Sequence, residues 1–265
     1  LFVHRKTDLT VHGLMPLHVD RAYRPADSRM RPFGIGSSHE YEVFLMGSAN
    51  PWTYIDVVLE DGARIHFDRT SPGTGWLDAV YTHTQTPSRF YMSSIRWQPS
   101  TVLGHWQLTF PNGDIWMFAE SSAATTPSAA GLIGILDRFG NRIDVERSGP
   151  YASVSRVSTS NGRYIAFDYD SSNRVIRLTD NAGRTVSYTY DALGRLWKVT
   201  NPEGGMTQYT YDASHRMTTI TDERGVRFLS NEYDASDRVV RQTLTDGATY
   251  AFVYSTDAQG RIVRT

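Results

Sequence analysis

The stretch that decides the fold is Gly183–Thr200, GRTVSYTYDALGRLWKVT, which carries one complete unit of an internal repeat. Val186, Tyr188 and Tyr190 alternate with small polar residues, so they share one face of a strand. The Asp191–Gly194 segment is a turn, because Asp accepts hydrogen bonds from the backbone that follows it and Gly adopts positive φ. A second strand follows this turn, so the unit predicts a β-hairpin.

The unit recurs five times at a nearly constant period. The repeat tyrosines lie 21 or 22 residues apart, each after a Gly, and most are followed by Asp and then Arg. The repeat residues are Gly162, Tyr169, Asp170 and Arg174; Gly183, Tyr190, Asp191 and Arg195; Gly204, Tyr211, Asp212 and Arg216; Gly225, Tyr233, Asp234 and Arg238; and Gly247, Tyr254 and Arg261. Such a period indicates stacked hairpins that can pair into one long sheet. One extra residue before Tyr233 predicts a β-bulge.

The rest of the chain also predicts β structure. Short runs such as Tyr54–Leu59 are rich in β-branched and aromatic residues, and hairpin signals such as Asp61-Gly62 and Asn112-Gly113 separate them. The Ala/Ser/Thr-rich segment 121–130 is the candidate domain boundary, and five of the six tryptophans precede it. We therefore expect an all-β chain. An aromatic-rich module covers 1–130, and an array of one degenerate and about five regular hairpin units covers 131–265.

Composition excludes several classes of protein. The 27 basic and 28 acidic residues give a net charge of -1, which argues against a surface that binds nucleic acid throughout. Of the basic residues only Lys6 and Lys198 are lysines, and arginine is the residue that pairs with carboxylates and stacks on aromatic rings. The absence of cysteine excludes disulfides and thiolate metal sites. The sequence contains no run of roughly 18 consecutive apolar residues, the length that would predict a membrane-spanning helix.

The repeat resembles the YD repeat of the Rhs (rearrangement hotspot) family, whose relatives include wall-associated proteins, teneurins and the shell components of Tc toxins. The first part of the chain resembles the module that precedes the repeats in bacterial Rhs proteins. One position departs from that pattern, because Ser37 stands where Trp is usual. The segments that carry this second resemblance are Thr7–Leu9, Gly13–Leu17, Arg21–Arg24, Pro32–His39 and Asp137–Arg142.

The resemblance implies a continuous curved sheet, the open part of a hollow shell that encloses or displays a C-terminal toxin. Five units cannot close such a shell, so we expect an N-terminal piece of a longer protein or a small open scaffold. The partners implied are the remaining repeats and the C-terminal effector. The localisation implied is secreted or at the bacterial cell surface, although the first residues have no signal-peptide layout.

The repeat tyrosines and arginines allow two interpretations. The rings can pack as a ladder along the sheet, with Arg stacking on them or bonding to Asp. Alternatively, aromatic rings can stack on sugars. Recurrence in every unit favours the structural interpretation. The second hypothesis for function is a carbohydrate-binding or adhesive module that binds cell-surface glycans, with exposed Trp76 and Trp97 as its contacts.

No pattern predicts catalysis. The eight histidines lack metal-ligand spacing, and no nucleophile elbow, P-loop or dinucleotide fingerprint is present. The pair His39-Glu40 is more simply explained by hydrogen bonds that order a loop. Asp168 and Asp170 lie two apart on one strand, but the next units do not maintain this pairing. We expect no enzyme, cofactor or metal, and a hydrolase has no catalytic constellation behind it.

Overall fold

The structure is a computed structural model that describes residues 2–48, 51–100, 104–119, 130–149, 152–257 and 262–264. Every regular element in these ranges is a β-strand, so the all-β prediction is confirmed. The described residues accordingly contain no helix that is long and apolar enough to cross a membrane.

The chain begins with a small separate sheet, which we call the N-terminal sheet. Its strands β1 (His4–Val11), β2 (Leu17–Tyr23) and β5 (Ser37–His39) pair antiparallel in the order β1-β2-β5. Between β2 and β5 the chain makes a two-stranded hairpin of β3 (Met30–Arg31) and β4 (Gly34–Ile35).

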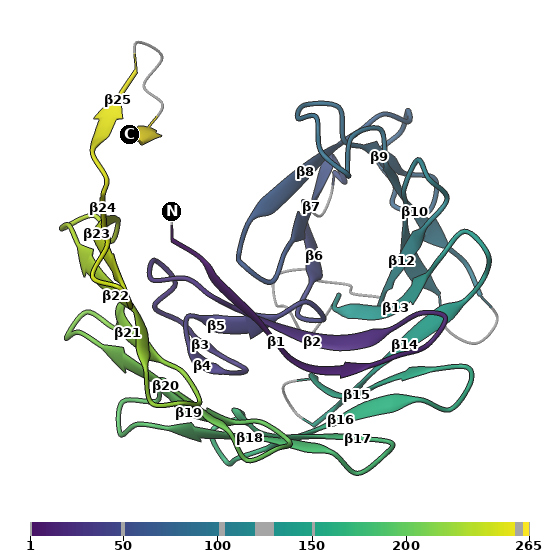
Figure 1. Cartoon of the computed structure of the whole chain (residues 1–265). Coiled ribbons are helices and arrows are strands. Elements are labelled where there is room, and N and C mark those ends of the chain that lie inside the picture. The colour runs from purple at the N-terminus through teal and green to yellow at the C-terminus, as the bar shows by residue number, and fades with distance from the viewer. Residues whose placement is uncertain are drawn as a thin grey trace.

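All strands from β6 to β24 belong to one antiparallel sheet, and its first part closes on itself. Phe44 bridges to Gly131, just before β13, so strands β6 to β13 form a closed ring (Figure 1). The strands of the ring are β6 (Phe44–Gly47), β7 (Tyr54–Val58), β8 (Arg64–Arg69), β9 (Val80–Thr82), β10 (Ser94–Gln98), β11 (His105–Thr109), β12 (Ile115–Phe118) and β13 (Leu132–Leu136).

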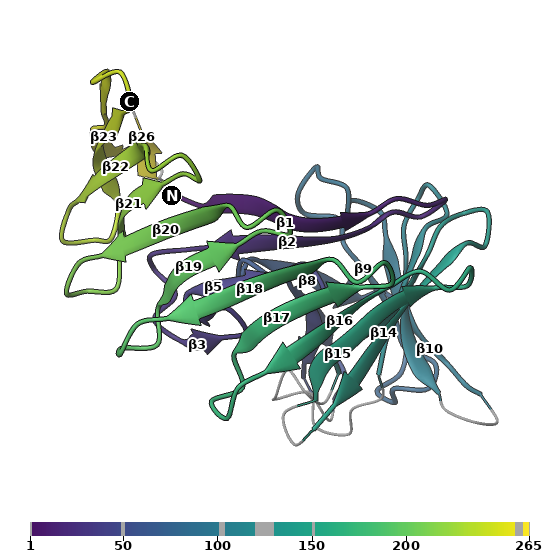
Figure 2. The same cartoon turned by 60° about the horizontal axis from the view of Figure 1, so that its bottom comes forward.

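The sheet then leaves the ring as a curved layer of hairpins, which we call the wall. Figures 1 and 2 show this layer bending around the N-terminal sheet, which confirms the predicted continuous curved sheet. The strands of the wall are β14 (Arg142–Ser148), β15 (Ser153–Thr159), β16 (Tyr164–Tyr169), β17 (Val175–Asp180), β18 (Thr185–Tyr190), β19 (Leu196–Thr200), β20 (Met206–Tyr211), β21 (Met217–Thr221), β22 (Arg227–Tyr233), β23 (Val239–Leu244) and β24 (Thr249–Ala251). A last hairpin pairs β25 (Tyr254–Thr256) with β26 (Ile262–Arg264).

The sheet is continuous from β12 through β13 to β14, on both sides of the boundary expected at residue 130. Most of the 121–130 segment lies outside the described residues. The division of the chain into domains at this point therefore stays a prediction.

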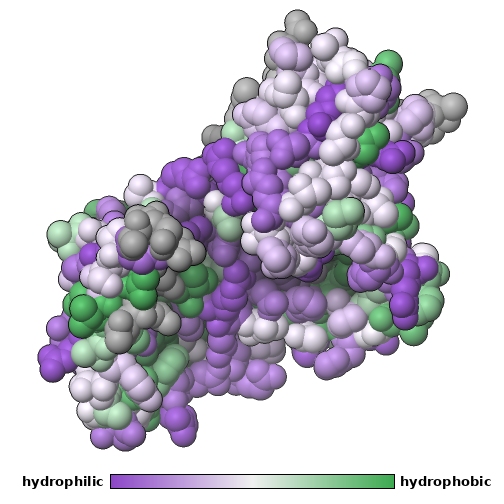
Figure 3. Space-filling view, turned by 90° about the horizontal axis from the view of Figure 1, so that it is seen from above, coloured by the Kyte–Doolittle hydropathy of each residue, from purple (hydrophilic) through white to green (hydrophobic). Residues whose placement is uncertain are grey.

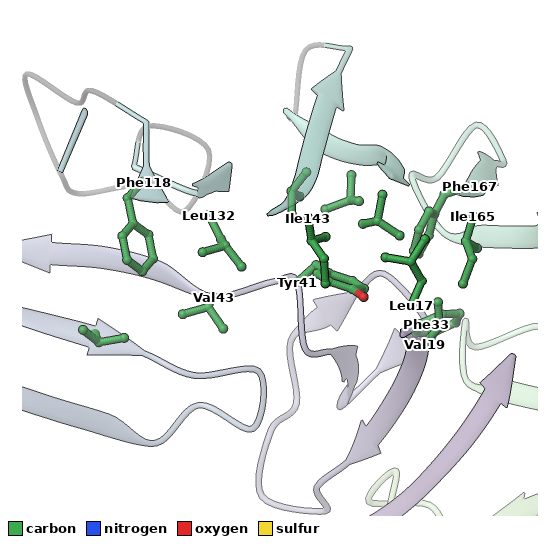
Figure 4. Packing of buried hydrophobic residues seen from close by; sticks show 14 of the residues in the cluster. Leu17, Val19, Phe33, Tyr41, Val43, Phe118, Leu132, Ile143, Ile165 and Phe167 are labelled. Carbon is green, nitrogen blue, oxygen red and sulfur yellow. The ribbon is translucent and has the colours of Figure 1, made fainter. Parts of the chain in front are cut away.

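The hydrophobic core covers the concave face of the wall and continues into the strands of the ring, for example at Val57, Phe67 and Ile95. The first strand of a repeat hairpin turns alternate large residues inward, as with Val186 and Tyr188 on β18. Leu17 and Val19 of β2 pack against this face near Phe167 of β16, and Figure 4 shows how these side chains meet. The N-terminal sheet therefore supplies the opposing surface that the concave side of the wall needs in order to be buried.

A β-bulge recurs in each of the first four units and accounts for the curvature of the wall. In β18–β19, Thr189 pairs with Lys198 and Tyr190 with Leu196, so Trp197 has no partner in the register. This skip places Leu196 and Val199, three residues apart, on the same buried face. Bulges bend a strand and increase its twist. The register skips the same position in the neighbouring units, at Ile176, Thr218 and Val240.

The extra residue in the fourth unit forms a second bulge. Ile220 pairs with Leu229 and Thr221 with Arg227, which leaves Phe228 as the inserted residue. The bulge predicted before Tyr233 is thus confirmed.

Candidate functional site: a repeat lattice and a docked N-terminal sheet

Each Tyr-Asp turn is closed by its own Asp and Arg. The Asp191 Oδ1 atom accepts hydrogen bonds from the backbone N–H of Leu193 and Arg195, and Oδ2 accepts one from Arg195 Nε at 2.6 Å. Burial opposes ionisation of Asp191, but these hydrogen bonds outweigh it and lower the pKa of the carboxyl. The same contacts recur in the pairs Asp170–Arg174, Asp212–Arg216 and Asp234–Arg238.

Each repeat tyrosine donates a hydrogen bond to the unit before it. The Tyr190 hydroxyl donates to the carbonyl of Val175, the first residue of β17. Burial raises the pKa of Tyr190, so the hydroxyl keeps its proton. The equivalent bonds run from Tyr169 to Val154 (2.8 Å), Tyr211 to Leu196 (2.8 Å), Tyr233 to Met217 (2.7 Å) and Tyr254 to Val239 (2.8 Å).

Each repeat arginine reaches forward to the unit after it. Arg195 and Arg216 also donate from Nη1 to the backbone carbonyls of Asp212 and Asp234. A guanidinium above an aromatic ring is a stabilising cation–π contact. The distances from guanidinium carbon to ring centre are 4.5 Å for Arg174 over Tyr190, 5.1 Å for Arg195 over Tyr211, 5.1 Å for Arg216 over Tyr233 and 4.6 Å for Arg238 over Tyr254.

Together these contacts form what we call the Tyr–Asp–Arg lattice. Within it, each Asp hydrogen-bonds the Arg of its own turn, and that Arg lies over the Tyr ring of the next unit. The hydroxyl of the same Tyr donates to the backbone carbonyl of the residue that follows the Arg. Arg261, the last predicted member, lies outside the described residues. The repeat glycines lie in the turns at the other end of the hairpins. Their predicted positive φ is confirmed at Gly162, Gly183, Gly204, Gly225 and Gly247.

A buried ion pair fixes the N-terminal sheet to the wall. Arg21 is completely buried and its Nε lies 2.9 Å from Asp8 Oδ2, a neighbour on β1 that is equally buried. Burial opposes the charge of Arg21, but Asp8 outweighs it and raises the pKa of the guanidinium. From the wall, Tyr188 donates to Asp8 Oδ2 at 2.9 Å, and Arg21 Nη2 donates to the Tyr209 hydroxyl at 2.8 Å. Two strands of the N-terminal sheet thereby engage two units of the wall.

The bulges supply further attachment points. Because a bulge leaves the ladder locally disrupted, the first residue of the following strand has a free backbone N–H. The N–H of Val175 donates to the Pro32 carbonyl at 2.7 Å, and that of Met217 donates to the Tyr23 hydroxyl at 2.8 Å. The Ile35 N–H donates to Gly194 O at 3.2 Å. The N-terminal segment therefore binds backbone groups that the repeat geometry leaves available.

The tryptophans expected to bind sugar are not exposed as a pair. Trp97 is buried with 9 % of its surface accessible, and Trp76 is half-buried at 4.9 Å from it in an edge-on contact. Trp97 pairs across strands with Trp106, and closure of the ring turns this face inward. The expectation of exposure is wrong for Trp97, because alternation marks one face of a strand without showing whether that face meets water.

His39 also differs from its sequence interpretation. Its ring lies among Phe33, Tyr41 and Phe167, and neither ring nitrogen has a hydrogen-bond partner. Burial, with a contribution from Arg147, lowers the pKa of His39 to about 3. The imidazole therefore packs as a neutral ring and does not order a loop through its nitrogens.

Comparisons with known proteins give matches to family models and to solved structures. Two family models match the chain: "RHS Repeat" over residues 169–206 and 190–227, and "Domain of unknown function (DUF6531)" over residues 1–67. A search of curated protein sequences finds no significant match.

Solved structures with a similar fold include three toxin-related proteins. The Photorhabdus luminescens Tc holotoxin pore is 11% identical over 99% of this chain and 15% of that chain, with a TM-score of 0.43. A TcdB2-TccC3 crystal structure is 13% identical over 79% of this chain and 14% of that one, with a TM-score of 0.37. The N-terminal domain of the effector protein SpvB from Salmonella typhimurium is 13% identical over 94% of this chain and 100% of that one, with a TM-score of 0.39. The chain thus spans about a seventh of the Tc toxin chains it matches.

The lattice, the bulged hairpins and the docked sheet define a structural module built from β repeats. The family models match both the repeats and the segment that docks on them. Residues 169–227 match the Rhs repeat model, so this part of the wall is built from Rhs/YD repeats.

Proposed function

We propose that the chain is the first part of a β-shell that encloses or displays a C-terminal effector of a larger Rhs/YD-repeat protein. The observation that carries this proposal is the repetition of the lattice. Every unit presents an Arg and a backbone carbonyl that receive the Tyr of the next unit, with nearly the same distances each time. A wall of this kind extends by adding identical units.

The C-terminal end of the wall supports further extension. Among the described residues β24 pairs only with β23, and its three residues are exposed. Tyr250 and Val253 are both more than half exposed. An exposed apolar strand edge is normally covered by pairing with another strand. The remaining repeats of the full-length protein are the partner that this edge fits.

The chain would act by enclosure and not by catalysis. Seen from above, the molecule is hollowed between two raised parts, and hydrophilic residues run along the hollow (Figure 3). A polar inner surface suits a cargo that must not adhere to its container. We place the protein outside the cell or at the cell surface, where such a cargo is delivered.

Protection of the cargo tests the proposal. In the full-length protein, the region after the repeats should resist added protease while the wall is intact. Arg174→Ala with Tyr190→Ala removes one lattice contact and should raise the cleavage rate of that region several-fold. Arg177→Ala, which removes an exposed ion pair with Asp168, is the matched control and should leave the rate unchanged. Equal cleavage in the wild type and the lattice variant would contradict enclosure.

A further inference from the structure

The N-terminal sheet has a second face, which is turned away from the wall. On β2, Leu17, Val19 and Arg21 are buried toward the wall, and the alternating residues His18 and Asp20 point the other way. This face lines a cavity of about 710 Å³ between the N-terminal sheet and the ring. Met15, Leu59, Trp116, Ile135 and Ile143 supply much of its apolar lining.

The strand register brings a third polar residue to the same place. Arg21 pairs with His39 between β2 and β5, so Glu40 follows beside Asp20. The Asp20 N–H donates to Glu40 Oε2 at 2.8 Å. One potential ligand atom from each of His18, Asp20 and Glu40 lies within 4.8 Å of the others.

Neighbouring groups orient these side chains toward one another. Thr7 Oγ1 donates to Asp20 Oδ1 at 2.5 Å, and Asp20 Oδ2 is left facing His18 Nε2 at 3.9 Å. Support of this kind, from groups behind the ligand atoms, is what fixes ligand geometry in metal sites.

One oxygen atom of the cluster is buried without a hydrogen-bond donor. Glu40 Oε1 is buried and has no hydrogen-bond partner among the residues that the structure describes. The nearby Arg5 is bonded to Glu60 and Asp61 instead. A buried carboxyl oxygen without a partner is costly, and a bound cation would give Glu40 Oε1 the partner that the described residues do not provide.

We propose that His18, Asp20 and Glu40 form a binding site for one divalent transition-metal cation, tested here with Zn²⁺. One imidazole nitrogen and two carboxylate oxygens suit Zn²⁺ better than Ca²⁺ or Mg²⁺, which prefer all-oxygen ligands. Three protein ligands leave a fourth position open to the cavity, where water completes the coordination. The ion would tie β2 to the end of β5 on the face that meets the ring.

Titration of the metal-free chain tests the site. After treatment with EDTA and removal of the chelator, isothermal titration with ZnCl₂ near neutral pH should show one ion per chain. Bound Zn²⁺ should also raise the melting temperature, because an ion that binds only the folded state stabilises it. Co²⁺ added in place of Zn²⁺ should give visible absorption bands that Zn²⁺ then displaces.

Variants locate the ion. His18→Ala and Glu40→Gln should each weaken binding at least tenfold and abolish the rise in melting temperature. His66→Ala is the matched control, because His66 also lies between two carboxylates but bonds Asp56 and Asp68 through its two separate nitrogens. It should leave Zn²⁺ binding unchanged.

The outcomes separate clearly. Absence of Zn²⁺ binding by the wild type, wild-type affinity in His18→Ala, or loss of binding in His66→Ala would each overturn the proposal. If Glu40→Gln fails to fold, His18→Ala decides, because 42% of the His18 side chain is exposed and its removal leaves the core intact.

Discussion

Asp8 and Arg21 form an ion pair that is buried on both sides between two layers of the molecule, with side-chain exposures of 1% and 0%. The pair joins two strands of the N-terminal sheet, and Tyr188 and Tyr209 of the wall each add one hydrogen bond to it, while Arg21 Nη1 has no partner among the described residues. Burial of two charges is offset only where the geometry is good and the remaining polar atoms have partners. The wall therefore supplies two of the hydrogen bonds that offset burial of the pair, which couples docking of the sheet to folding of the repeats.

Breaking the pair should release the N-terminal sheet. Arg21→Met leaves Asp8 as an uncompensated buried charge, and we expect the free energy of unfolding to fall by about 3–5 kcal/mol. Urea denaturation measures this loss, and hydrogen exchange should show reduced protection in β18 and β20. The exposed pair Arg177–Asp168 is the control, since Arg177→Met should change the free energy of unfolding by about 1 kcal/mol or less. Equal effects of the two variants would show that the buried pair does not hold the sheet.

The tyrosine hydroxyl and ring make separable contributions to the lattice. Tyr211→Phe removes the hydrogen bond to Leu196 O but keeps the ring under Arg195, so we expect a loss of about 1 kcal/mol in the free energy of unfolding. Tyr211→Ala removes both and should cost about 3–5 kcal/mol. Equilibrium unfolding in urea distinguishes these values. A loss in Tyr211→Phe as large as in Tyr211→Ala would assign the stabilisation to the hydroxyl alone.

The repeats could be predicted from sequence because their contacts are local. The Tyr of each unit bonds 15 or 16 residues back, and Asp bonds Arg four residues on, so the periodicity contains the pattern. Even the bulge at Phe228 follows from a count of residues. The all-β class and the paired hairpins followed from this periodicity, whereas the curvature of the sheet was implied by the family resemblance.

The docking of the N-terminal sheet could not be predicted in the same way. Arg21 meets Tyr209 across 188 positions, and no spacing along the chain records such a contact. A partial signal existed, because Tyr188 and Tyr209 both stand two residues before a repeat Tyr, where alternation places them inward. Likewise, the burial of Trp97 depends on closure of the ring by the distant Phe44–Gly131 bridge.

Glycine substitutions separate backbone strain from steric conflict. Gly183 has a φ of +80° and no heavy atom within 4 Å of an added Cβ, so Gly183→Ala meets strain alone, about 1–2 kcal/mol. Gly183→Val and Gly204→Val should lower the melting temperature further, because β-branched residues tolerate positive φ least. Gly183→Asn should be nearly neutral, since Asn173 already adopts a φ of 58° in a wall turn.

Gly34 provides the contrasting case. A Cβ there would lie 2.6 Å from the Gly194 carbonyl oxygen, a backbone atom that cannot move aside. Gly34→Ala should therefore destabilise the chain more than Gly183→Ala, and the measured loss should come with increased hydrogen exchange at Ile35. Equal melting temperatures for the two variants would mean that the segment does not contact the wall as closely as the structure shows.

Acid should destabilise the module through buried neutral histidines. Burial, together with nearby cationic groups, lowers the pKa of both His4 and His39 from 6.5 to about 3 in the folded state. The unfolded chain therefore binds protons at a higher pH than the folded chain, so stability rises with pH in this window. As the pH falls from 6.5 toward 3, each histidine should remove up to about 1.4 kcal/mol per pH unit from the free energy of unfolding.

A substitution at His39 tests this coupling directly. Its ring lies among three aromatic side chains, and neither nitrogen has a hydrogen-bond partner among the described residues, although Glu42 Oε1 lies 3.8 Å from Nε2. His39→Phe therefore keeps the packing and removes the titrating group. Urea denaturation at several pH values between about 7 and 4.5 should show a shallower decline for His39→Phe than for the wild type. The double variant with His4→Phe should flatten the decline further. A wild-type slope in His39→Phe would show that the ring is charged or exposed in solution, against its position in the structure.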